Sequence, residues 1–104
     1  MGSYTAIMTK QLLERRLRDA SARLRRLRED LGVAEEQLAH FTDEADEARL
    51  RALVSETPGS DREHRAAQRH AAAMARHRDE VRAQIEALER NQDELLDQLQ
   101  ELSS

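Results

Sequence analysis

The stretch Val54-Ser-Glu-Thr-Pro-Gly-Ser-Asp-Arg-Glu63 lies near the middle of the chain and holds its single proline and one of its three glycines. Pro58-Gly59 is a favoured pair for the centre of a type II turn, because proline sets the first φ angle and glycine accepts the positive second one. Ser60 and Glu63 have the S-x-x-E spacing of a capping box, which begins a helix by bonding its free amides. The stretch therefore predicts one reversal between two helices.

In the residues before this stretch, apolar side chains recur at alternating spacings of four and three residues. The pattern is uninterrupted from Leu13 to Ala52. A seam with this heptad spacing is typical of a coiled coil. Its a positions are Leu17, Leu24, Leu31, Leu38, Ala45 and Ala52, and its d positions are Leu13, Ala20, Leu27, Ala34, Phe41 and Ala48. Gly32 lies off the seam, so we interpret it as a tolerated weak point or a slight bend in the helix.

A second seam follows the turn. Its d positions are Ala67, Met74, Val81, Leu88, Leu95 and Leu102, and its a positions are His64, Ala71, Arg78, Ile85, Gln92 and Leu99. Arg78 and Gln92 interrupt the apolar pattern, and polar residues at a positions reduce stability while they fix register or partner number.

These patterns predict an all-α fold, an antiparallel two-helix coiled-coil hairpin. We expect helices over residues 10–55 and 61–101, a turn at 56–60, a flexible N-terminal segment at 1–9 and a C-terminal tail at 102–104. If the reversal centres near Pro58, four complementary pairs face each other across the helices: Arg28 and Glu89, Glu35 and Arg82, Arg51 and Glu63, Glu44 and His70. Two alternatives stay open: Thr42 can cap a third helix, and Met8 can be the natural start, with residues 1–7 preceding it.

The composition argues against an enzyme. Charged residues make up 37% of the chain and aromatic residues 2%, which is typical of long helices. Cysteine is absent, which excludes disulfides and thiolate metal sites, and no phosphate-binding loop or catalytic motif occurs. His70 and His77 lie seven residues apart, whereas a shared metal on a helix favours a spacing of four. We therefore expect a non-enzymatic, cytoplasmic protein with no cofactor, no metal and no membrane contact.

Three aliphatic residues, Leu50, Leu53 and Val54, lie off the seam near the turn and face away from the other helix. An exposed apolar group of this kind is typical of a binding surface. We expect it to bind a second copy, so that two hairpins form a four-helix bundle, or to bind another protein. Covering of the three side chains by the turn itself is the alternative.

The charges are unevenly distributed. The first helix begins with a basic stretch at residues 10–28, and its arginines are candidates for contacting phosphates of a nucleic acid: Arg15, Arg16, Arg18, Arg23, Arg25, Arg26 and Arg28. The competing interpretation is neutralisation by the acidic residues that the hairpin places beside them in the second helix, from Glu86 to Glu101. The formal net charge of -4 gives no overall attraction to nucleic acid.

Residues 29–63 carry an acidic excess that includes Glu35, Glu36, Asp43, Glu44, Asp46 and Glu47. A helical hairpin with acidic residues near its end is similar in outline to the RNA-polymerase secondary-channel regulators. That resemblance implies an alternative function, as a transcription-associated factor that contacts RNA polymerase or nucleic acid. The chain departs from that pattern at the turn, where Thr57-Pro58-Gly59-Ser60 has no acidic residue. The main expectation is a small adaptor, regulator or scaffold that acts by helix–helix docking.

Overall fold

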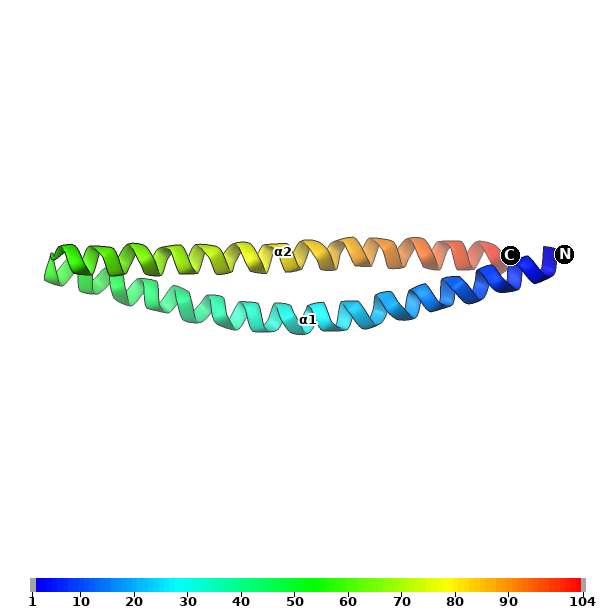
Figure 1. The fold of residues 1–104 in the computed structure, drawn as a ribbon, viewed down its shortest axis with the longest axis horizontal. Coiled ribbons are helices and arrows are strands. Elements are labelled where there is room, and N and C mark those ends of the chain that lie inside the picture. The colour runs from blue at the N-terminus through cyan, green and yellow to red at the C-terminus, as the bar shows by residue number, and fades with distance from the viewer. Residues whose placement is uncertain (1, 104) are drawn as a thin grey trace. The chain divides into compact units, whose positions relative to one another are not determined.

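The computed structural model describes residues 2–103, with side chains from Thr5 onward, and this part of the chain forms two α-helices. Helix α1 spans Gly2–Ser55 and helix α2 spans Pro58–Ser103. The two pack antiparallel against each other as a helical hairpin (Figure 1), which confirms the fold class predicted from the heptad pattern. Neither helix is long and apolar enough over the described residues to cross a membrane.

Both helices are longer than the sequence predicted. Helix α1 begins at Gly2 instead of residue 10, because nothing between residues 3 and 9 terminates a helix and the Thr9 hydroxyl bonds back to the Thr5 carbonyl at 2.9 Å. Helix α2 continues to Ser103, whose hydroxyl donates to the Leu99 carbonyl at 3.1 Å. The segments predicted as 1–9 and 102–104 are therefore helical as far as they are described.

Helix α1 is continuous through Thr42, so the three-helix alternative is wrong. The seam explains this result: Phe41 is half-buried and Ala48 is buried, and a break between them would have rotated one of these side chains away from α2. The helix also runs through Gly32, which is exposed and has no neighbouring atom within 4 Å of the position a Cβ would take.

The described residues fall into two compact units. The first comprises Met1–Glu29 and Ala83–Ser104 and therefore holds the two ends of the hairpin. Its core is aliphatic, and the buried side chains come from both helices: Leu13, Ala20, Leu24 and Leu27 from α1, and Ile85 and Leu95 from α2. A hydrogen bond from Gln92 Nε2 to Ser21 Oγ, at 3.0 Å, joins the two helices beside this core.

The second unit, Asp30–Arg82, holds the turn and has a thinner core. Its buried side chains are Ala34, Ala48 and Val81. Leu31, Leu38, Phe41 and Met74 are half-buried. Alanine buries little apolar area, so this unit gains less from the hydrophobic effect than the first.

Two of the four predicted interhelical pairs form. Arg82 Nη2 lies 3.0 Å from Glu35 Oε1, and Arg51 Nε lies 3.7 Å from Glu63 Oε2. The other two predicted pairs form no ion pair among the described residues. Arg28 and Glu89 form no ion pair, and Glu44 instead pairs with His40, one turn earlier on the same helix, at 3.2 Å. A partner four residues away on one helix needs no particular alignment of the two helices, so Glu44 finds it more readily than His70.

The turn is shorter than predicted and uses different residues. Helix α1 ends at Ser55, and Glu56 takes a left-handed conformation with φ 52° while its N–H bonds the Ala52 carbonyl at 3.0 Å. Thr57 then caps α2, because its Oγ1 accepts from the Ser60 N–H at 3.2 Å. The predicted type II turn and the predicted capping box at Ser60 are therefore wrong.

Pro58 has a different role from the one predicted, since it is the first residue of α2. Proline suits this position because its missing N–H has no partner in the first turn and its fixed φ is already helical. At the reversal, the Ser60 hydroxyl is hydrogen-bonded to the hydroxyls of both Ser55 and Thr57. These polar contacts, instead of a glycine turn, close the hairpin.

Replacing Glu56 by glycine is expected to raise the free energy of unfolding by about 0.5–1 kcal/mol. The left-handed conformation destabilises a residue that has a Cβ by roughly 1–2 kcal/mol, and glycine avoids this strain. The net gain in stability is smaller because glycine has more conformational entropy in the unfolded chain. Thermal unfolding followed by circular dichroism measures the change. Glu56→Ala is the matched control, since it removes the carboxylate and leaves the backbone strain. Equal stability of the two variants would show that the strain is unimportant.

Candidate functional site

Leu50, Leu53 and Val54 occupy the last two turns of α1 and are exposed. Their exposed fractions are 63%, 63% and 86%, so the turn does not cover them and that alternative is excluded. The three residues have the spacing i, i+3 and i+4, which places them together on the side of α1 opposite the seam. We call Leu50, Leu53 and Val54 the aliphatic patch.

An open depression of about 650 Å³ adjoins the aliphatic patch. Leu50 and Val54 contribute its apolar side, and Gly59 and Ser60 of α2 lie opposite them. The ion pair between Arg51 and Glu63 lies at its edge. Such a depression can accept an aliphatic side chain of a partner, with a charge of either sign available beside it. Leu53 does not line the depression and extends the apolar surface away from it.

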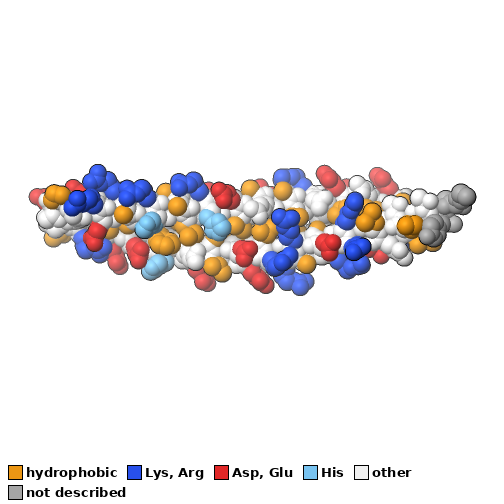
Figure 2. Space-filling view, in the orientation of Figure 1, with side chains coloured by type: hydrophobic (Ala, Val, Ile, Leu, Met, Phe, Trp, Pro, Cys, Tyr) orange, Lys and Arg blue, Asp and Glu red, His pale blue; other side chains and the backbone are white. Residues whose placement is uncertain are grey.

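The outer surface of α1 in this unit is acidic. The side chains of Glu36, Asp43, Asp46 and Glu47 are exposed and lie on the same side of α1 as the aliphatic patch. In the space-filling view, Asp and Glu side chains predominate along the α1 margin next to the turn (Figure 2). We call Glu36, Asp43, Asp46 and Glu47 the acidic face.

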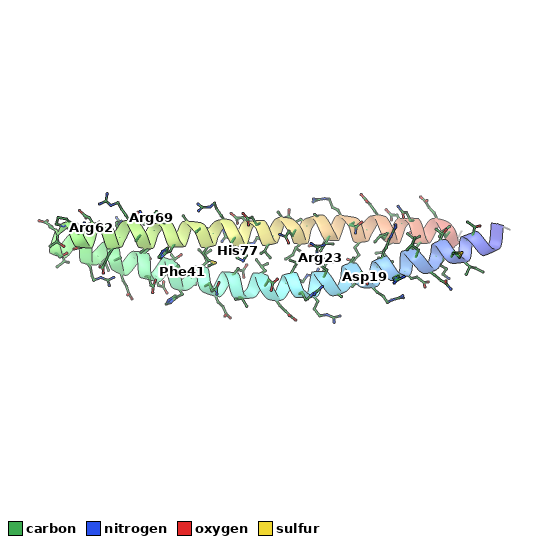
Figure 3. The ribbon with its side chains drawn as sticks, viewed as in Figure 1. Asp19, Arg23, Phe41, Arg62, Arg69 and His77 are labelled. Carbon is green, nitrogen blue, oxygen red and sulfur yellow. The ribbon has the colours of Figure 1, made fainter. Side chains whose placement is uncertain are left out.

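The outer surface of α2 in the same unit is basic. Its exposed arginines are Arg62, Arg65, Arg69 and Arg76, which we call the basic face. Figure 2 shows arginines gathered along the α2 margin, and Figure 3 labels Arg62 and Arg69 on it. Alanines at 66, 72 and 73 lie between them, so no bulky side chain covers the arginine stems. The basic face was not predicted from the sequence, although the arginine repeated every seven residues at 62, 69 and 76 is a signal that could have identified it.

The seven arginines predicted to contact phosphates lie in the other unit and are all exposed. They surround α1 instead of forming one stripe, since Arg15, Arg16 and Arg18 occupy three different heptad positions. The acidic residues of α2 from Glu86 onward belong to the same unit, as the hairpin predicted. Exposure alone does not distinguish phosphate binding from mutual neutralisation, so this site stays a prediction.

The histidines near the turn-proximal seam make aromatic contacts. The rings of Phe41 and His70 meet edge to face with centroids 5.9 Å apart, and His40 lies 5.7 Å from Phe41. His64 Nδ1 is buried without a hydrogen-bond partner. Within residues 2–103 no three histidine or carboxylate side chains gather as metal ligands. The contact between Phe41 and His70 joins α1 to α2 and so contributes to packing between the helices.

No family model, no curated protein and no solved structure matches this chain in comparisons of its sequence and fold. The aliphatic patch and the charged faces beside it are therefore the features of the chain that bear on its function.

Proposed function

We propose that this protein is a non-enzymatic interaction module, an adaptor, regulator or scaffold that acts by helix–helix docking. The observation that supports it is the exposure of three neighbouring aliphatic side chains on a helix whose own seam is already covered by α2. Isolated exposed apolar residues are ordinary on protein surfaces, whereas a contiguous group bordered by charges is typical of a binding surface.

The docking mode follows from the geometry of the patch. Residues spaced i, i+3 and i+4 on a regular helix are the anchors by which one helix packs along another. The depression beside Leu50 and Val54 receives a side chain from the partner, and Arg51 and Glu63 border that contact. Aliphatic contacts of this kind supply affinity, while the acidic and basic faces set orientation and partner choice.

Replacing Leu50 and Leu53 together by serine is expected to weaken association at least tenfold, because burying each leucine is worth roughly 1.5–3 kcal/mol. Association is measured as the concentration dependence of mass in light scattering and as proteins retained by the tagged chain. Helicity measured by circular dichroism should stay unchanged, since both side chains are exposed.

Leu12→Ser with Leu96→Ser is the matched control. These two leucines are 44% and 50% exposed and lie in the other unit, so the same chemical change occurs away from the patch. Association should survive in this variant. Equal binding by the patch variant and the control variant would contradict the proposed site.

A further inference from the structure

We infer that the aliphatic patch is covered by the turn end of a second copy of this chain, which docks the basic face of its α2 on the acidic face of α1. The inference rests on the proposed function, because it names the occupant of the same surface. Both faces lie within the unit Asp30–Arg82, and all of their side chains are exposed.

Charge complementarity selects this occupant. Asp and Glu predominate on one outer surface of the unit, and Arg on the other. Docking α2 of one copy against α2 of another would place arginine against arginine, and docking α1 against α1 offers the carboxylates no cation on the contact surface. Only α1 against α2 brings opposite charges together along the whole face, and like charges facing each other across an interface are strongly unfavourable.

The spacing of the charges fits one antiparallel register. When α2 of the second copy runs antiparallel to α1, three pairs fall level with each other, and the residue numbers in each pair add to 112: Glu36 with Arg76, Asp43 with Arg69, and Glu47 with Arg65. The alanines at 66, 72 and 73 of α2 fall between these pairs and let the helices approach closely.

The same register covers the aliphatic patch. Leu50 lies level with the stem of Arg62, Val54 with Pro58 and Leu53 with Gly59, all of which present aliphatic or uncharged atoms. Moving the second copy by one heptad to a sum of 105 leaves Leu50, Leu53 and Val54 beyond the end of α2. Moving it the other way, to a sum of 119, keeps α2 over these residues but leaves only one charge pair between the two faces, Asp43 with Arg76. The register that adds to 112 therefore satisfies both the charges and the apolar residues.

The arrangement differs from the closed dimer that the sequence predicted. Because each contact joins two different faces, both copies keep one face free, and assembly continues beyond two chains. Within one chain, the alignment of α1 with α2 is given by the pairs Arg51–Glu63 and Glu35–Arg82, whose residue numbers add to 114 and 117. Relative to that alignment, the docked copy is displaced along the helix axis by about 5 Å, or one helical turn.

Light scattering of the full-length chain tests this inference. The contact covers only about five turns of helix, so association is expected to be weak and to need concentrations on the order of 100 µM. The mean mass should rise above 11.9 kDa as concentration increases, without a plateau at two chains. It should fall again in about 0.5 M salt, because salt screens exposed charges.

Two charge-reversal variants make the test specific. Asp43→Arg with Glu47→Arg places arginines level with Arg69 and Arg65 of the docked copy, and Arg65→Glu with Arg69→Glu places glutamates level with Glu47 and Asp43. Each variant alone should associate at least tenfold more weakly than the wild type, while an equimolar mixture of the two should associate again. Glu94→Arg with Asp97→Arg and Arg25→Glu with Arg26→Glu change the charge equally in the other unit and should associate like the wild type.

Three outcomes would overturn the inference. The first is a wild-type chain that stays at 11.9 kDa at every concentration. The second is a stable dimer of the Arg65→Glu, Arg69→Glu variant alone, which would indicate pairing of α1 with α1. The third is a mixture of the two variants that does not associate. If the wild type stays monomeric but binds another protein through Leu50 and Leu53, the proposed function stands and only the self-docking fails.

Discussion

Replacing Leu24 by alanine is expected to lower the free energy of unfolding by about 3 kcal/mol. Leu24 is 2% exposed and is the largest side chain that the described residues bury almost completely. The substitution removes the transfer free energy of the lost methyl groups and leaves a cavity that two long helices cannot collapse to fill. Small domains are stable by only about 5–15 kcal/mol, so the loss is a large part of the total.

Urea unfolding followed by circular dichroism measures this effect. Leu12→Ala is the matched control, because Leu12 is 44% exposed and lies on the same helix in the same unit. The control should change the free energy of unfolding by less than about 0.5 kcal/mol. Similar losses in the two variants would mean that Leu24 does not contribute to a packed interface.

The heptad pattern alone predicted the core residues because a two-helix coiled coil has a single interface. The twelve seam positions from Leu13 to Ala52 are all buried or half-buried, and those of α2 follow the same rule except Leu102, which is 43% exposed. The repeat of seven residues fixes which side of each helix faces the other. No further information was needed to choose the buried side chains.

The turn was harder to predict because its residues fit two arrangements. Pro58 can hold the second position of a type II turn or the first position of a helix, and its φ is the same in both. Thr57 and Ser60 are both good caps, so residue preference does not choose between them. The left-handed Glu56 decides the outcome, and a glutamate gives no sequence signal for that conformation.

The candidate site was predictable in part. The aliphatic patch was recognisable because Leu50, Leu53 and Val54 are three apolar residues close together at off-seam positions, most of which are polar. The basic face was missed because arginines separated by alanines are common on any solvent-exposed helix. The face becomes distinctive only beside the oppositely charged outer surface of α1. The partner that binds such a surface must carry a surface of matching shape and charge. A single sequence identifies that partner only when the same chain also carries the matching surface.

Replacing Arg78 and Gln92 together by leucine is expected to raise the free energy of unfolding by about 2–3 kcal/mol. Both residues hold a positions in α2 and are half-buried. Arg78 pairs at 3.0 Å only with Asp79, its neighbour on the same helix, so its charge gains no partner across the interface. Leucine at both positions adds apolar burial to the seam, and Ser21, which loses the bond from Gln92, is exposed and can bond water instead.

The added stability is expected to be accompanied by a loss of specificity. The bond from Gln92 to Ser21 forms only when the two helices are aligned in one way, and an arginine at an a position disfavours additional helices against the seam. Sedimentation velocity should therefore show the double variant in more assembly states than the wild type. Arg90→Leu with Gln98→Leu makes the same chemical change at exposed positions and should alter neither stability nor assembly. A double variant that is more stable yet assembles like the wild type would show that register is set elsewhere, by the apolar seam and the Glu35–Arg82 and Arg51–Glu63 pairs.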